Sequence, residues 1–286
     1  MLTLFTIPKP FRGHIAVIQR NAIQSWTLLR PACEIILLGN DEGTAEAAVE
    51  FGVRHIPDIA HNDYGTPLVN DLFEKAKHLA TYDLLCYINA DIILMSDFIR
   101  AAKQVAYLRQ WFLMVGQRWD VALKELWDFS ASDWEDRLRA YVENEGELHP
   151  KWGIDYFVYP RDLLVTIPPF AIGRPGWDNW VLYHARESTG TLVDATEVVM
   201  AVHQDHGFGQ FGSKQGRAVS PETQRNRELM GKEYCTLQDA THRLLSSRLH
   251  CAWLRQITYP LRRLLVHFPM LQLPVLAMHK LRALSR

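Results

Sequence analysis

Three short polar segments contain residue types that could do chemistry. The first, residues 89–91 (Asn-Ala-Asp), directly follows the apolar run over residues 84–88. The second contains two histidines, His203 and His206, and the third opens a helical pattern with Asp178. Carboxylate oxygens bind hard cations such as Mg²⁺ and Mn²⁺, imidazole also suits Mn²⁺, and a carboxylate beside a hydroxyl can accept its proton. The sequence therefore offers a candidate metal site and a candidate general base.

The elements expected to position these residues alternate between strand and helix. Continuous apolar runs predict buried strands, and apolar residues at three- and four-residue steps predict helices. The predicted strands cover residues 2–7, 34–39, 53–56, 84–88 and 111–115. The predicted helices cover residues 15–29, 45–51, 67–80 and 96–110. This alternation predicts an α/β fold with a parallel sheet and helices on both faces.

In such sheets, ligands bind outside the carboxyl ends of the strands. This rule selects three loops, at residues 8–14, 40–43 and 89–93. A lone acidic residue at such a position is often only a helix cap or a turn residue. Here Asp41 follows the second strand as Asp91 follows the fourth, and Thr6 ends the first. These side chains are therefore expected to line one pocket.

In their order along the chain, these features resemble nucleotide-diphospho-sugar transferases of the GT-A glycosyltransferase fold. The resemblance implies a Rossmann-like, mostly parallel sheet flanked by helices, and a nucleotide-sugar donor held through Mn²⁺ or Mg²⁺. In that family the first-strand loop holds the nucleobase, later polar residues contact the nucleoside, and an Asp-x-Asp signature holds the metal. The matching positions here are Thr6, Ile7, Pro8, Asp41, Asn70, Asn89, Ala90 and Asp91.

The chain departs from that family at the first position of the signature. Asn89 stands where the family has an aspartate, so this position can hydrogen-bond a ribose or a water but carries no charge. Asp91, the second position and the usual direct metal ligand, is retained. The resemblance therefore still implies a metal on Asp91, with a lower expected affinity or with more support from the substrate phosphates.

The acceptor side is expected in the middle of the chain, which is rich in aromatic residues. In members of the family that invert the anomeric centre, a carboxylate at a helix start acts as the general base, and Asp178 matches it. The alternative is that Asp178 only caps its helix. Trp177 is a candidate to stack on a sugar ring or to join the core, and Asn179 and Asp155 are candidates for substrate binding.

A late histidine is a further metal ligand in many GT-A enzymes, and His203 or His206 resembles it. The alternative is an exposed polar turn. A G-x-G-x-x-G pattern follows at Gly207, Gly209 and Gly212. No strand–helix unit surrounds it, so a flexible lid over the donor is expected there rather than a dinucleotide site.

Three functions are weighed for the chain. The first is glycosyl transfer from a nucleotide sugar to a sugar or a lipid-linked acceptor. The second is a sugar-1-phosphate nucleotidyltransferase, which is disfavoured because the first loop lacks a glycine-rich phosphate-binding pattern. The third is a non-catalytic nucleotide-sugar binding protein, and Asn89 is the feature that keeps it open.

Charge divides the chain unevenly. Residues 240–286 contain eight basic residues and no acidic ones, whereas residues 1–239 have a net charge of −9. We expect a GT-A-like domain over 1–239, with a nucleotide-binding half (1–115) and an acceptor half (116–239), followed by a basic helical extension over 240–286. That extension either covers the body or a partner chain, or contacts a membrane surface, since basic amphipathic segments bind anionic lipid.

The composition limits the other classes of function. The 286 residues have a net charge of −1, which gives no reason to expect nucleic-acid binding. The four cysteines are far apart in sequence, which disfavours a disulfide scaffold. No apolar stretch reaches the roughly 20 residues of a membrane-spanning helix, and the first residues lack the pattern of a signal peptide. We therefore expect a cytoplasmic protein, with peripheral contact at the inner face of the membrane left open.

Overall fold

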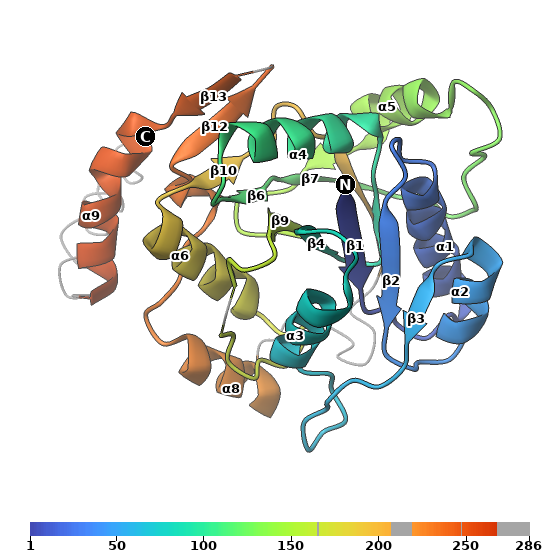
Figure 1. Cartoon of the computed structure of the whole chain (residues 1–286), viewed down its shortest axis with the longest axis horizontal. Helices are drawn as coiled ribbons and strands as arrows, with labels where there is room; N and C mark the ends of the chain where they lie inside the picture. The colour runs from blue at the N-terminus through green and yellow to red at the C-terminus, as the bar shows by residue number, and fades with distance from the viewer. Residues whose placement is uncertain (165, 207–218, 247, 268–286) are drawn as a thin grey trace, which may run out of the picture.

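The computed structural model of the chain describes residues 1–164, 166–206, 219–246 and 248–267 (Figure 1). Its main sheet has nine strands. Their order across the sheet is β13 (Arg248–Cys251), β12 (His242–Leu245), β10 (Leu192–Asp194), β6 (Leu113–Val115), β9 (Tyr156–Pro160), β4 (Leu84–Ile88), β1 (Leu2–Thr6), β2 (Glu34–Leu38) and β3 (Arg54–Ile56). Strands β4, β1, β2 and β3 are parallel, as are β12, β10 and β6, whereas β9 runs antiparallel between the two groups. The predicted α/β fold with a mostly parallel sheet is therefore confirmed.

Helices cover both faces of this sheet. On one face, Phe5 and Tyr87 pack with α3 (Val69–Leu79) and α6 (Trp177–Thr189). On the other, neighbouring strand residues such as Leu4 pack with the next set of helices. These are α1 (Gly13–Thr27), α2 (Thr44–Phe51) and α4 (Ser96–Leu108). Because successive strand residues point to opposite faces, strands buried on both sides need continuous apolar runs, and that is the pattern the sequence has.

A second, four-stranded sheet lies beside the carboxyl end of β4. Its order is β5 (Ile92–Ile93), β11 (Ala201–Gln204), β7 (Arg118–Val121) and β8 (Glu147–Leu148), and α5 (Trp134–Glu145) packs against it. Strands β10 and β11, which are close together in sequence, therefore belong to two different sheets. The turn between β10 and β11 moves the chain from the main sheet to the second one, which carries His203 toward the end of β4.

The C-terminal segment is only partly helical. The short 3₁₀ helix η2 (Leu237–Asp239) comes first. Strands β12 and β13 then form a hairpin at the edge of the main sheet, and α9 (Trp253–His267) follows the hairpin. The expectation that the extension is helical from residue 240 is wrong for residues 242–251, which form two strands, the first of them paired in parallel with β10. The division at residues 115 and 239 stays a prediction. Among the described helices, none is long and apolar enough to cross a bilayer.

Candidate active site

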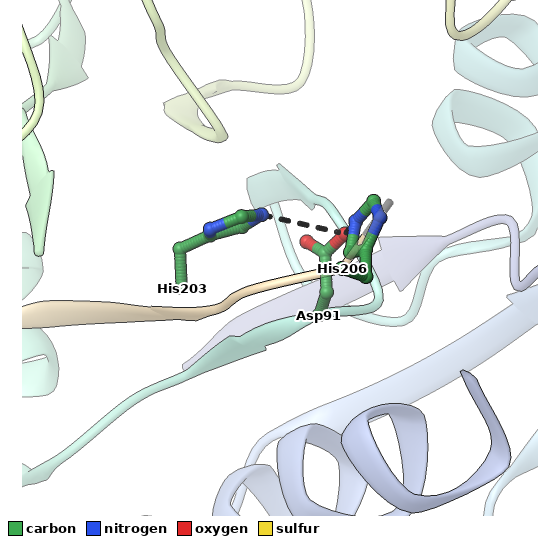
Figure 2. A group of neighbouring side chains, drawn as sticks. All are labelled: Asp91, His203 and His206. Carbon is green, nitrogen blue, oxygen red and sulfur yellow. Dashed lines mark hydrogen bonds and ion pairs between the residues drawn. The ribbon is translucent and has the colours of Figure 1, made fainter. Parts of the chain in front are cut away.

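Sheet pairing brings the three candidate metal ligands together. Asp91 lies between β4 and β5, and antiparallel pairing of β5 with β11 places His203 opposite Ile92. Asp91 Oδ2 is 2.9 Å from His206 Nε2 and 3.9 Å from His203 Nε2 (Figure 2). One ligand atom from each of the three residues lies within 4.8 Å of the others. The structure therefore assembles one carboxylate and two imidazoles at the carboxyl edge of the parallel strands.

The chemistry of this cluster fits a divalent cation. Asp91 is only 8% exposed, and its Oδ1 has no hydrogen-bond partner among the residues that the structure describes. A buried polar atom without a partner is costly. Burial opposes ionisation of Asp91, but the hydrogen bond with His206 and the charges of His203 and Lys9 outweigh it and hold its pKa well below the usual range. An ionised carboxylate with a free oxygen beside two imidazoles suits Mn²⁺ or Mg²⁺.

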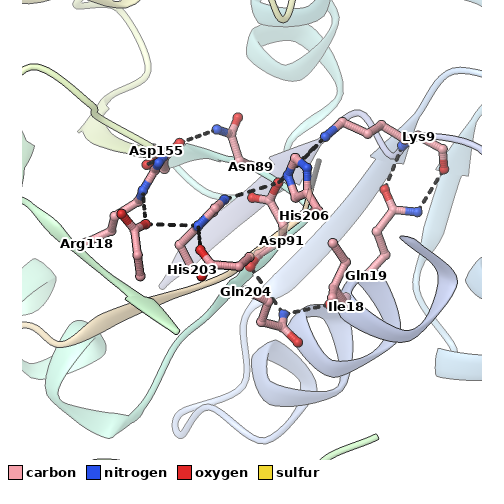
Figure 3. Close-up of polar contacts among 12 residues, drawn as sticks. Lys9, Ile18, Gln19, Asn89, Asp91, Arg118, Asp155, His203, Gln204 and His206 are labelled. Carbon is pink, nitrogen blue, oxygen red and sulfur yellow. Dashed lines mark hydrogen bonds and ion pairs between the residues drawn. The ribbon is translucent and has the colours of Figure 1, made fainter. Parts of the chain in front are cut away.

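Lys9 approaches the same cluster from the loop after β1. Its Nζ lies 3.3 Å from His206 Nε2 and 3.9 Å from Asp91 Oδ2. Gln19 of α1 fixes the Lys9 backbone, accepting a hydrogen bond from its N–H at 2.6 Å and donating one to its carbonyl at 2.8 Å (Figure 3). Lys9, Arg12 and His14 all belong to the loop at residues 8–14 that the carboxyl-edge rule selects. The structure places the Lys9 ammonium beside the candidate metal ligands, whereas Arg12 pairs with Glu42.

Asp120 lies behind His203. Parallel pairing of β11 with β7 sets the two residues opposite each other, and His203 Nδ1 is 3.0 Å from Asp120 Oδ1. The other oxygen of Asp120 is 2.5 Å from His149 Nδ1, and Arg118 Nε donates to Oδ1 at 2.7 Å. A carboxylate on the far nitrogen of a metal-binding histidine fixes its tautomer and its orientation. Asp120 thus leaves Nε2 of His203 to face Asp91.

A second group of possible ligands consists of Asp120, His203 and Asp205. It shares His203 with the first group. In this second group, Asp120 already forms a salt bridge with the guanidinium of Arg118, which neutralises its charge. Asp91, His203 and His206 are therefore the better candidate of the two groups for a metal site.

The structure gives a reason for asparagine at position 89. The Asn89 side-chain amide donates to Asp155 Oδ1 at 2.5 Å, and its carbonyl accepts from Tyr87 Oη at 3.0 Å. Arg118 Nη1 pairs with the other oxygen of Asp155 at 2.6 Å. An aspartate at position 89 would oppose the buried carboxylate of Asp155, whereas asparagine supplies a donor. Asn89 therefore holds the carboxylate of Asp155, the residue that precedes β9, beside the end of β4.

Asp178 lies at the first turn of α6. Gly176 precedes the helix with φ of 113°, a backbone conformation that favours glycine, and its N–H donates to Asp178 Oδ1 at 3.3 Å. Burial raises the pKa of Asp178 to about 6, and the charge of Asp155 adds to the shift. Asp155 also raises the pKa of His203, although burial is the largest influence there and opposes it. Asp155 is therefore within electrostatic reach of both the metal-ligand cluster and the candidate base.

Two expected substrate contacts have structural partners instead. Trp177 is 6% exposed and packs on Tyr87 at 5.2 Å between ring centroids and on Phe157 at 5.2 Å. The expectation that Trp177 stacks on a sugar is therefore corrected to a core position, which anchors the start of α6 beside β4. The Asn179 side-chain amide donates to the Cys235 carbonyl at 2.9 Å, so it ties α6 to the following loop.

The residues expected around the nucleotide follow the strand ends as predicted from the order of elements. Thr6 ends β1 and is buried, and its hydroxyl has no partner within the described part of the chain. The side-chain amide oxygen of Asn70 on α3 is also buried and has no hydrogen-bond partner among the described residues. Asp41 is exposed after β2, and burial of its carboxyl group raises its pKa somewhat. Ile7 is half-buried and Pro8 is buried in the loop after β1. Their contacts with a nucleobase stay predictions.

Three of the site residues had no signal in the sequence. Arg118, Asp120 and His149 reach the cluster only through the pairing of β7 with β11 and β8. Lys9 had a usable signal, because it lies in a loop at the carboxyl end of a parallel strand. The expected lid at Gly207, Gly209 and Gly212 lies outside the described residues.

Comparison with known proteins gives structural neighbours. No protein-family model matches the sequence, and comparison with curated proteins finds no match either. Glucosyl-3-phosphoglycerate synthase from Mycobacterium tuberculosis, in complex with Mn²⁺, UDP and glucosyl-3-phosphoglycerate, gives a TM-score of 0.48 at 16% identity over 79% of each chain. Its complex with Mg²⁺ and UDP gives 0.46 at 13%, again over 79% of each chain.

A second enzyme has a comparable likeness. Mannosyltransferase PcManGT from Pyrobaculum calidifontis, in complex with GDP-Man and Mn²⁺, gives a TM-score of 0.48 at 13% identity, over 76% of this chain and 60% of that one. These neighbours are a glucosyl-3-phosphoglycerate synthase and a mannosyltransferase, each in complex with a divalent cation and a nucleotide or nucleotide sugar. At such identities, a function for this chain has to be argued from its own residues.

Proposed function

We propose that the chain transfers a sugar from a nucleoside-diphosphate sugar to a hydroxyl group of an acceptor. The observation that carries the proposal is the convergence of Asp91, His203 and His206 at the carboxyl edge of the parallel strands. This edge is where open α/β sheets bind nucleotides. Lys9 adds a positive charge beside the cluster, as binding of a diphosphate requires.

In this proposal, Asp91, His203 and His206 hold Mn²⁺ or Mg²⁺. The bound cation would neutralise the negative charge that develops on the leaving diphosphate. Lys9 would contact the same phosphates, and Asp120 would keep Nε2 of His203 directed at the cation. Asn89 and Asp155, joined by a hydrogen bond, would present polar groups to the hydroxyls of the sugar or the ribose.

Asp178 is the proposed general base. It would take the proton from the acceptor hydroxyl as that oxygen attacks the anomeric carbon, through a transition state of oxocarbenium character. A carboxylate with a pKa of about 6 is ionised at neutral pH and is a stronger base than an ordinary aspartate. The proposed acceptor is a sugar or a lipid-linked sugar, and inversion or retention is left to product analysis.

Replacing Asp120 with asparagine should weaken metal binding. Asp120→Asn removes the charge beside His203 Nδ1, and loss of such a partner lowers metal affinity by about 10–100-fold. The Kd for Mn²⁺, measured from the electron paramagnetic resonance of the free ion, should rise by that factor. Asp136→Asn, an exposed position on α5, is the matched control and should leave the Kd unchanged. A lower melting temperature with an unchanged Kd would show that Asp120 only supports the fold.

A donor screen tests the proposed function itself. Melting temperatures are measured with UDP-, GDP-, dTDP- and CMP-sugars, each with and without Mn²⁺, because a ligand of the native state raises the melting point. We expect one donor to stabilise the chain, and more strongly with Mn²⁺. Its products are then identified: a nucleoside diphosphate supports sugar transfer. Free pyrophosphate would instead support a nucleotidyltransferase, and binding without turnover a non-catalytic protein.

A further inference from the structure

Helix α9 is attached to the body through its polar side. Arg255 Nη1 pairs with Asp194 Oδ2 at 2.9 Å, and Arg262 Nη2 pairs with Asp239 Oδ1 at 2.8 Å. Between them, Tyr259 is buried and its hydroxyl donates to the Glu187 carboxylate at 2.8 Å. The arginines of this helix therefore point inward, to acidic groups of the protein.

The opposite side of α9 is apolar and faces outward. The large apolar side chains on it are between 43% and 67% exposed: Trp253, Leu254, Ile257, Leu261 and Leu264. Their spacing of three and four residues, with Leu254 next to Trp253, puts them on one face of the helix. A surface helix normally buries its apolar face against the core, so α9 has the reverse orientation. A contiguous exposed apolar stripe of this kind marks an interaction surface.

Charge identifies the kind of partner. From residue 240 to the end, the sequence has eight basic residues and no acidic one. Arg248 of β13, next to α9 in the chain, is exposed, and residues 268–286 add Lys280, Arg282 and Arg286. A second copy meeting the stripe face to face would bring two such basic segments together, which is unfavourable. A negatively charged surface that also accepts apolar side chains fits better.

We propose that α9 docks through this outward face on an anionic phospholipid bilayer, with its axis in the plane of the headgroups. Amphipathic helices bind such surfaces by burying apolar side chains at the boundary with the acyl chains, helped by attraction between anionic lipid and nearby basic residues. Here those residues are Arg248 and the basic residues of 268–286, because Arg255 and Arg262 are paired with the body. Trp253, at the start of the helix, is of the type enriched at this boundary. Because the arginines of α9 lie on the side that contacts the body, the apolar stripe itself carries no charged side chain.

Contacts through Cys235 connect α9 to the start of α6, where Asp178 lies. Tyr259 Oη is 3.7 Å from Cys235 Sγ, and the Cys235 carbonyl accepts the hydrogen bond from Asn179, next to Asp178. If the proposed function holds, binding of α9 to lipid would bring the enzyme to a bilayer that carries a lipid-linked acceptor. The docking proposal itself depends only on α9 and its charge.

Vesicle flotation of the full chain tests the docking. Vesicles are made of equal parts phosphatidylglycerol and phosphatidylcholine, or of phosphatidylcholine alone. The test variant is Leu254→Gln with Ile257→Gln, whose side chains are 62% and 67% exposed and so are replaceable without disturbing the core. The matched control is Val49→Gln with Tyr107→Gln, at 84% and 90% exposure on other helices.

We expect the wild-type chain and the control to float with the anionic vesicles and to stay unbound with phosphatidylcholine alone. The test variant should lose at least tenfold in the bound fraction at an unchanged melting temperature. No flotation of the wild type, or equal flotation of the test variant, would overturn the proposal. Equal binding to both kinds of vesicle would overturn the anionic part. Stabilisation of the test variant by the donor and Mn²⁺ reports separately on the proposed function.

Discussion

Replacing Asp91 with alanine is expected to lower kcat by about a thousandfold or more. The substitution removes the carboxylate that both histidines face, and with it the charge needed to hold the cation. A cation contributes several kcal/mol to stabilising charge in a displacement, and every 1.36 kcal/mol corresponds to a factor of ten in rate. Initial rates of nucleoside-diphosphate release with Mn²⁺ and the stabilising donor measure the loss.

Asp83→Ala is the matched control for this variant. Asp83 precedes β4, at the opposite end of the strand from Asp91, and its side chain is 98% exposed. Its replacement should change the rate less than twofold. Transfer by the Asp91→Ala protein at the wild-type rate would show that the metal assignment is wrong.

Replacing Asp178 with asparagine is expected to lower kcat by roughly 10²–10⁴-fold, the range contributed by general-base catalysis. The Kd of the donor with Mn²⁺ should be unchanged, because Asp178 is assigned to the acceptor side. For the wild-type chain, kcat should fall as pH drops below about 6, where the Asp178 carboxylate takes up a proton. A large rise in the donor Kd, with kcat intact at saturation, would place Asp178 in donor binding.

The same substitution should stabilise the fold in a pH-dependent way. Asp178 has a raised pKa of about 6 when folded, so it ionises in the unfolded chain at lower pH than in the folded one. The protonated group therefore contributes its full stability below pH ~4. This contribution, on the order of 3 kcal/mol, is lost as pH rises to about 6. The Asp178→Asn protein has no such loss, because the amide does not ionise.

Melting temperatures across pH check this sign. The Asp178→Asn protein should melt above the wild type at pH 8, and the difference should close toward pH 4. If the two proteins differ in melting temperature by the same amount at pH 4 and pH 8, burial does not raise the pKa of Asp178.

The sequence predicts the fold of residues 1–115 well, because its signals there are local. Continuous apolar runs such as residues 84–88 are typical of strands buried on both faces, and the structure has β4 there. The carboxyl-edge rule then selected Asp91 from the chain alone. Predicting His203 and His206 as metal ligands required the family resemblance as well, because nothing in residues 202–206 indicates which strand lies beside them.

The remainder of the site depends on contacts between distant parts of the chain. Asp120 meets His203, and His149 meets Asp120, through the register of a small sheet. Short strands such as β8, with two residues, carry little pattern to predict from. Trp177 illustrates the opposite error. Its place beside Asp178 suggested a sugar platform, but only the packing on Tyr87 and Phe157 shows that its ring is enclosed.

The departure at Asn89 is also a matter of tertiary contact. In sequence it weakens the metal signature, whereas in the fold the asparagine amide meets the carboxylate of Asp155, just before β9. This contact joins two residues that are far apart in the chain, and no local pattern could have predicted it.

Anomalous diffraction at the manganese edge tests the central claim most directly. Crystals are soaked with MnCl₂ and the nucleoside diphosphate of the stabilising donor. The predicted result is an anomalous peak at about 2.0–2.3 Å from Asp91 and the nearer imidazole nitrogens, with the diphosphate on its other side. A bound nucleotide whose manganese lies away from Asp91, or that binds with no manganese at all, would contradict the assignment of this cluster as the donor's metal site.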